Sequence, residues 1–237
     1  GTYRVRLSVE RHVAVDSFWS RISRAGHRCA VIDVPHCKLD PDINGLHVIN
    51  WMTHFKTVEG FATTPPDLAE DLVRRFGRDP FPHCNAIDHS PEALADFAEG
   101  LLSRVSWRTE FALEQIAGGT FDLVAVTYGE GHCVGHQCYH QHLAAPFSDD
   151  DPIVRIYRAI DRGVGRLLDA CPDDCAVVLL ASHGMGPHND GSHLAARLVR
   201  QADLALDVGR RVALSRRMLD FIHGNRVGRF LGLAARL

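Results

Sequence analysis

The chain has 237 residues, of which 46% are hydrophobic, and its formal net charge is -3. This length and composition suffice for one sizeable core, so we expect one domain or part of one. The near-neutral charge gives no global field that would favour nucleic acid or a membrane surface. The longest strongly apolar stretch, residues 175–181, is far shorter than the roughly 20 residues of a transmembrane helix, and no signal peptide is visible.

The cysteines indicate free thiols rather than a disulfide framework. There are seven of them, an odd number with irregular spacing, and no two form a C-x-x-C pair. This pattern argues against both a disulfide scaffold and a structural zinc knuckle, and it favours a reducing, cytoplasmic compartment. The close pair Cys171 and Cys175 leaves one alternative open, a bridge across a turn.

The first elements follow from apolar spacing and from residues that end helices. Residues 16–25 are predicted to be helical, and Gly26 ends this helix as a glycine after a helix C-terminus does. Residues 27–34 form a short apolar run typical of a buried strand. Residues 36–66 look irregular, with a strong turn signal at Asn44-Gly45. We expect this stretch to be a long surface loop or a hairpin excursion from a sheet.

Helices and buried strands alternate along the next part of the chain. A helix is predicted at 66–76, and a long one at 90–117, which Ser90 caps and Pro91 opens. A strand at 121–127 follows, then a helix from Asp151-Pro152 to about residue 170, and a third strand at 175–181. Strands separated by helices of this length predict right-handed crossovers and an α/β fold, a mainly parallel sheet flanked by helices.

The C-terminal segment differs in composition from the rest. Residues 194–237 carry nine arginines among apolar residues, which is typical of a basic amphipathic helix. Such a helix either exposes a solvated face or lies on a membrane or partner.

Two histidine-bearing segments follow the predicted strands at 121–127 and 175–181. The first contains Glu130, His132 and His136, and the second contains His183 and His188. Histidine is the commonest metal ligand, and ligands collect at the carboxyl ends of parallel strands. His132 and His136 are four residues apart, so on a helix both imidazoles share one face. We therefore predict one metal site built from both segments.

The other members of this set have alternatives. Glu130 either binds the ion or orients His132 from behind. His188 either binds the ion or simply belongs to the following helix. The ion is predicted to be zinc, with manganese as the alternative, since a histidine-rich site accepts several first-row ions.

Three segments in order carry a resemblance to a known family. The first segment comprises three stretches, Phe18-Trp19 through Gly26, residues 30–35 and Asn44-Gly45. The second is Gly131-His132-Cys-Val-Gly135-His136, and the third is Ser182-His183-Gly184-Met185. Over about residues 15–190 the chain resembles the type I phosphodiesterase and nucleotide pyrophosphatase branch of the alkaline phosphatase superfamily. The second and third segments are similar to this branch's Asp-x-x-Gly-His and Ser-Asp-His-Gly-Met metal loops.

The resemblance implies an alkaline phosphatase-like fold and an enzyme with two divalent ions, commonly zinc, and a Thr or Ser nucleophile. It implies that His136 and His132, the latter at the family's Asp position, bind one ion and that His183 binds the other. Ser182 stands where the family has a metal-binding Asp. The family's nucleophile and first metal-binding Asp precede the Phe18-Trp19 segment, and its last metal-binding His follows well downstream. We therefore assign no nucleophile here.

The predicted function is hydrolysis of small-molecule phosphate esters by a metal-dependent phosphodiesterase-type enzyme, or by the central part of one. The alternative is a catalytically inactive alkaline phosphatase-like scaffold or binding domain, which Ser182 favours. A third alternative is a truncated product that does not fold stably. For the hydrolase and for the inactive scaffold, we expect residues 1–237 to form a single, partial domain. The sequence predicts neither the substrate nor the oligomeric state.

Overall fold

The computed structural model describes most of the first three quarters of the chain, namely residues 15–54, 60–81, 88, 90–144, 146–181, 184–186, 194, 198–199 and 201. The chain divides into two compact units, residues 1–185 and 186–237. The helices and strands given below all lie in the first unit. Nearly all of the predicted basic segment 194–237 lies outside the described residues. The predictions of that segment and of a single domain stay predictions.

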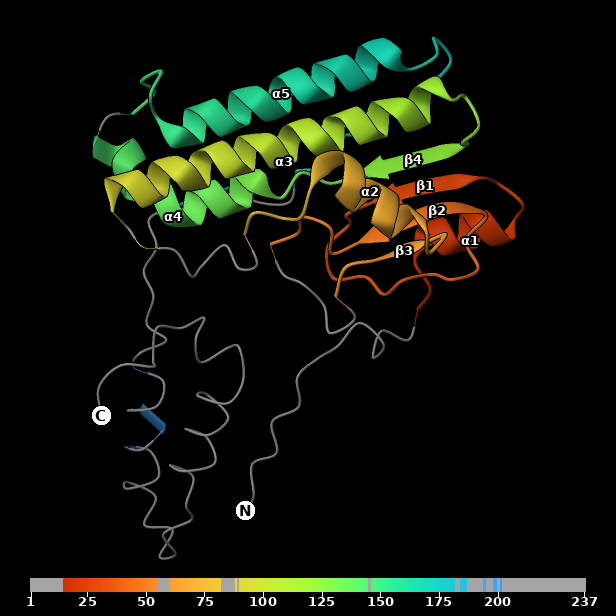
Figure 1. The fold of residues 1–237 in the computed structure, drawn as a ribbon, viewed down its shortest axis with the longest axis horizontal. Coiled ribbons are helices and arrows are strands. Elements are labelled where there is room, and N and C mark those ends of the chain that lie inside the picture. The colour runs from red at the N-terminus through yellow and green to blue at the C-terminus, as the bar shows by residue number, and fades with distance from the viewer. Residues whose placement is uncertain are drawn as a thin grey trace, which may run out of the picture. The chain divides into compact units, whose positions relative to one another are not determined.

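The first unit combines five helices with a four-stranded sheet in its described residues (Figure 1). In chain order the elements are α1 (Phe18–Arg24), β1 (Cys29–Ile32), β2 (Gly45–Ile49), β3 (Ala62–Thr64), α2 (Leu68–Phe76), α3 (Pro91–Ala117), β4 (Leu123–Val126), α4 (Glu130–Ala144) and α5 (Pro152–Ala170). The strand order is β3-β2-β1-β4, with β1 parallel to both neighbours and β3 antiparallel to β2. The predicted α/β fold with a mainly parallel sheet is confirmed.

Helices cover both faces of this sheet because successive side chains of a strand point to opposite sides. Ala30 and Ile32 of β1 are fully buried in a core formed with α2, α3 and α5. Cys29 and Val31 face the other way, into a smaller core with Trp19 of α1. The helices α3 and α5 lie side by side, and α4 packs against both (Figure 1). The described sheet is thus the middle layer of three.

The capping residues set the helix boundaries where the sequence predicts them. Ser90 accepts a hydrogen bond from the backbone N–H of Ala93, and Asp151 accepts one from Ile153, so both satisfy a free N–H of the first helical turn. Gly77 ends α2 with φ 87°. These local signals are the reason why the predicted helices agree with α2, α3 and α5 to within about two residues.

Of the two alternatives for residues 36–66, the surface loop is wrong, whereas a hairpin agrees with the antiparallel pairing of β2 with β3. This stretch contains β2 and β3, and β2 lies in the interior of the sheet with four of its five residues buried. The turn signal at Asn44-Gly45 marks the entry into β2 instead of a loop tip. Gly45 has φ +137°, and a Cβ there would lie 2.2 Å from the carbonyl oxygen of Cys29. Glycine is therefore required where β2 comes alongside β1.

The predicted third buried strand, residues 175–181, is not a strand in the structure. The residues Val177 to Leu180 are 55–86% exposed. An apolar run supplies side chains for a core, but a strand also needs a neighbour with free backbone groups. The described sheet ends at β4, and no described strand pairs with the run, so local pattern alone does not make it a strand.

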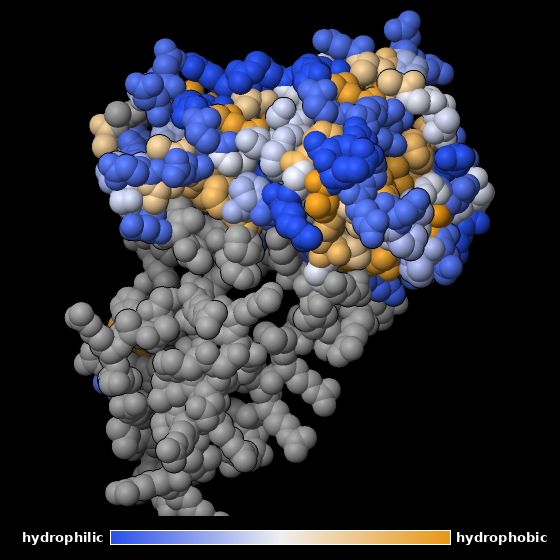
Figure 2. Space-filling model, viewed as in Figure 1, coloured by the Kyte–Doolittle hydropathy of each residue, from blue (hydrophilic) through white to orange (hydrophobic). Residues whose placement is uncertain are grey.

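The surface shows no sign of a membrane-spanning element within the described residues. None of the described helices is both long and apolar enough to cross a bilayer. The described face in Figure 2 mixes hydrophilic residues with smaller apolar areas. The six described cysteines are free, and these include Cys171 and Cys175, so the bridge considered between them is absent.

Candidate functional site

Three imidazole rings lie together at the carboxyl end of the sheet. His132 and His136 stand four residues apart on α4, and their ring centroids are 4.4 Å apart. His54 follows β2, and its ring centroid is 4.4 Å from that of His132 and 5.9 Å from that of His136. We call these three residues the histidine cluster. The prediction that His132 and His136 share one helical face agrees with this geometry.

The packing of α4 determines which residues it turns toward His54. Cys133, Val134 and Cys138 are buried against α3 and α5, in a core that these three helices share. His132 and His136 flank this buried stripe and are half-buried. The apolar stripe thus packs α4 against its neighbours, and the two imidazoles lie at the border of this stripe.

A buried ion-pair network holds the start of α4. Arg108 of α3 and Glu130, the first residue of α4, are each no more than 1% exposed at the side chain. Nη1 of Arg108 donates to both carboxylate oxygens of Glu130, at 2.7 and 2.8 Å. The sequence predicts Glu130 as a metal ligand or as a partner of His132, whereas both its oxygens accept from Arg108. The described contacts of Glu130 therefore anchor the helix turn that carries His132.

The same network holds the segment that leads to His54. Nη2 of Arg108 donates to Asp33 Oδ2 at 3.0 Å and to the carbonyl of Met52 at 3.1 Å. The Asp33 carboxylate also accepts from the backbone N–H groups of Trp51 and Met52, at 2.8 and 2.9 Å. Asp33 itself has φ +56° at the end of β1. One guanidinium thus joins the end of β1, the chain before His54 and the start of α4.

The electrostatics of this network favour its charged form. Burial alone would lower the pKa of Arg108, but the carboxylates of Glu130 and Asp33 outweigh burial and raise it above its usual value. Two carboxylates face one guanidinium, which leaves an excess of negative charge beneath the histidine cluster. A cation near the cluster would be favoured by that excess.

His54 is not among the predicted site residues, because it lies in the stretch 36–66, for which the sequence predicts a surface loop or a hairpin excursion. The signal that identifies it is its position a few residues after β2, the same strand-end argument that selects His132. Its Nδ1 lies 3.4 Å from the thiol sulfur of Cys133, so His54 contacts α4 beside both other histidines.

The second predicted segment is only partly described. Ser182, His183 and His188 lie outside the described residues. Met185 is described, and a Cβ placed at Gly135 would lie 2.7 Å from its Cγ. Met185 therefore contacts α4 at Gly135, the residue before His136, and the prediction of one site built from both segments stays a prediction.

The metal set is not complete within the described residues. No group of three or more His, Cys, Asp or Glu side chains there has its donor atoms arranged to hold an ion. The imidazoles of the histidine cluster have the donor chemistry that zinc accepts, and the two remaining predicted histidines lie outside the described part. The histidine cluster therefore has ligand-type side chains close together, but within the described residues these do not form a metal site.

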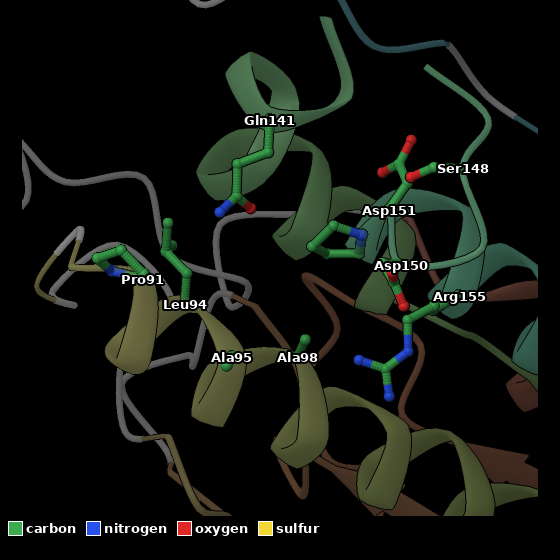
Figure 3. Close-up of a pocket in the computed structure, with 10 residues that line it drawn as sticks. Pro91, Leu94, Ala95, Ala98, Gln141, Ser148, Asp150, Asp151 and Arg155 are labelled. Atoms are coloured by element: carbon green, nitrogen blue, oxygen red, sulfur yellow. The ribbon is translucent and has the colours of Figure 1, made fainter. Parts of the chain in front are cut away.

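A pocket of about 290 Å³ lies elsewhere, between α3, the end of α4 and the start of α5 (Figure 3). Two of its charged lining residues, Asp151 and Arg155, have partners within the chain. Asp151 accepts from the Ile153 N–H at 2.9 Å and pairs with His142 Nδ1 at 2.5 Å, and Arg155 pairs with Glu99 at 2.6 Å. No member of the histidine cluster lines this pocket, so we do not place the reaction there.

Comparison with known proteins gives one positive result. The sequence profile of the family described as type I phosphodiesterase / nucleotide pyrophosphatase matches residues 3–226. No curated protein and no solved structure matches the chain. The profile covers most of the chain, including the strands of the sheet, the histidine cluster and the second histidine-bearing segment.

Proposed function

Because the chain belongs to the type I phosphodiesterase / nucleotide pyrophosphatase family of the alkaline phosphatase superfamily, we propose that it is a metal-dependent hydrolase of phosphate esters, or the central part of one. The observation that supports this most strongly is the pairing of His132 and His136 on one face of α4, directly after β4. Family membership alone does not establish an activity, so these side chains are the basis of the proposal.

In this proposal the ion is zinc or manganese, and His132, His136 and His183 bind it, with His188 as a further candidate. Glu130 supports them through the helix start that it fixes with Arg108. When bound, such an ion supplies positive charge that stabilises the oxygens of a phosphoryl group during displacement. The chain's own residues orient these imidazoles, and the buried network below them resists their movement.

The second candidate function is a non-catalytic scaffold that retains the fold for binding. Ser182 favours it, because a neutral hydroxyl stands where the family has a metal-binding carboxylate. A hydroxyl is a much poorer ligand for zinc than a carboxylate or imidazole. The two functions differ in whether the chain turns over a phosphodiester.

Hydrolysis of bis(p-nitrophenyl) phosphate by the purified full chain tests the proposal. We expect turnover that zinc or manganese supports, that a chelator abolishes and that the His136→Ala variant loses. His27→Ala is the matched control, since His27 is exposed and precedes β1, at the opposite end of the sheet from the histidine cluster. Metal-independent turnover, or equal turnover by both variants, would contradict metal-dependent hydrolysis at this site. A folded chain that binds zinc without turnover would favour the scaffold.

A further inference from the structure

Two cysteines that are not part of the histidine cluster stand together at the carboxyl end of α5. Cys171 directly follows the last residue of α5 and caps the helix, with its backbone N–H donating to the carbonyl oxygen of Leu168 at 3.1 Å. Cys175 comes four residues later, at the start of the exposed apolar run 175–181. Both thiols are free in the structure.

A tight turn brings these two thiols into contact. The backbone N–H of Cys175 donates to the carbonyl oxygen of Pro172 at 3.0 Å, which is the hydrogen bond of a four-residue β-turn. This turn reverses the chain directly after the helix, and the side chain of Cys171 is hydrogen-bonded to that of Cys175. The Cys171 sulfur also lies 3.2 Å from the carbonyl oxygen of Leu167. The helix therefore holds one sulfur in place, and the turn carries the other sulfur to it.

The pair is accessible, unlike the buried cysteines of the same unit. Cys175 is exposed and Cys171 is half-buried, whereas Cys29, Cys133 and Cys138 are buried. Reaction of a thiol with an oxidant requires access to the sulfur and formation of the thiolate. Burial, and then the hydrogen bond and charge of Cys175, raise the pKa of Cys171. An oxidant therefore reacts first with Cys175, and Cys171 is placed to displace it.

We propose that Cys171 and Cys175 form a reversible disulfide, a redox modification site that ties the start of the run 175–181 to the end of α5. The oxidant is a small disulfide such as oxidised glutathione. The Cys175 thiolate attacks one sulfur of this disulfide and releases one glutathione, which leaves a mixed disulfide on Cys175. The Cys171 thiolate then attacks the Cys175 sulfur and releases the second glutathione. The two protons of the cysteines pass to the two released glutathiones, so the cysteine pair is oxidised as the glutathione disulfide is reduced.

The position of the bond makes it reversible. The bridge closes a loop of only five residues, from Cys171 to Cys175, and so short a loop contributes little closure entropy to the bond. The bond also lies at an exposed turn, where reducing thiols reach it, and exposed disulfides are the easily reduced ones. In a reducing compartment such bonds are transient, which agrees with the free thiols of the structure.

The bond restrains the chain that follows α5. Val177 to Leu180 are exposed, and no described strand pairs with them. In the reduced chain the turn at Pro172 holds the start of this run by one backbone hydrogen bond. Oxidation adds a covalent link to α5, which packs against α3 and α4 in a shared core.

Peptide mass spectrometry of the full chain, equilibrated with oxidised and reduced glutathione, tests this inference. Free thiols are alkylated before digestion, and trypsin releases both cysteines in one peptide, residues 167–197. A bridge leaves this peptide without alkyl groups and two hydrogens lighter than its reduced form. We expect the bridged peptide to dominate under excess oxidised glutathione and to disappear under excess reduced glutathione. An alkylated Cys171 and Cys175 under the oxidising condition would overturn the inference.

Two variants, each checked for folding by circular dichroism, identify the partner of Cys175. Cys171→Ser removes the displacing thiol, so at least about tenfold more Cys175 is expected to keep its glutathione than in the unaltered chain. Cys37→Ser is the control, since Cys37 is also free and half-buried, and we expect its bridge to form as in the unaltered chain. Equal retention of glutathione with and without Cys171 would overturn the inference, as would loss of the bridge in Cys37→Ser.

The same equilibrium measured in urea separates the fold from the sequence spacing. The native turn and helix hold the two sulfurs in contact, so the bridge is expected to be favoured by at least about tenfold in the folded chain over the unfolded one. An equal ratio of bridged to reduced peptide in both states would overturn the role of the structure in holding the pair together.

Discussion

Replacing Arg108 by Met tests the claim that one buried guanidinium supports both walls of the histidine cluster. Arg108 makes four hydrogen bonds, two to Glu130, one to Asp33 and one to the Met52 carbonyl, at 2.7–3.1 Å. Met retains the length of the apolar stem but leaves two carboxylates, each 0% exposed at the side chain, without their countercharge. Breaking a buried ion pair from one side costs about 3–5 kcal/mol.

The matched control is Arg166→Met, which removes a partner from Glu110 on the surface. The side chains of that pair are 52% and 43% exposed, so its loss is expected to cost less than about 1 kcal/mol. Guanidinium chloride unfolding followed by circular dichroism, with a chelator present to exclude stabilisation by bound metal, measures both variants. Equal stability losses in the two variants would refute the claim that the Arg108 network supports the site.

Three further predictions concern single residues of the same unit. Gly45→Ala is expected to cost more than about 2 kcal/mol of unfolding free energy, since a Cβ would meet the Cys29 carbonyl at 2.2 Å; a thermal melt indistinguishable from that of the parent would contradict the close approach. Burial lowers the pKa of His47 to about 4, against a weaker opposing effect of Asp40. The folded chain therefore binds a proton at His47 less readily than the unfolded chain does. The unfolding free energy is highest above about pH 6.5, and about 3 kcal/mol of it is lost as the pH falls to 4. Denaturant unfolding at several pH values should show a smaller dependence for His47→Gln, and an unchanged dependence would contradict this origin. Burial raises the pKa of the Cys138 thiol to about 11, so iodoacetamide at pH 8 should label exposed Cys175 and spare Cys138 in the native chain; peptide mass spectrometry showing equal labelling would contradict the burial.

The sequence predicts those elements whose causes are local. Ser90 followed by Pro91, and Asp151 followed by Pro152, carry both the cap and the first-turn proline, and α3 and α5 begin where these residues place them. Glycine after the last apolar position likewise predicts the end of α2.

Elements that depend on distant partners were not predictable in the same way. The strand β2 is buried because it lies between β1 and β3, and its short apolar run is masked by the turn residues before it. The run at 175–181 is the opposite case, with strand-like residues but no described neighbouring strand. The local pattern indicates which side chains of a segment can be buried, but the segment forms a strand only where a neighbouring strand pairs with it.

The same division applies to the site. His132 and His136 were identifiable because both are on one helix after a strand, whereas His54 reaches them only through the parallel pairing of β1 with β2 and β4. The network below them joins Asp33 and Arg108 across 75 positions of the chain, and no local signal connects such residues. Such a buried ion-pair network can be identified only from the three-dimensional arrangement of the sheet and α3.

Metal content of the purified full chain, determined by elemental analysis, tests the central claim most directly. We predict at least about one zinc or manganese ion per chain, retained in the His27→Ala control and lost in His136→Ala. A folded chain that holds no divalent ion, even after incubation with zinc and manganese, would contradict the account and leave a scaffold without metal chemistry.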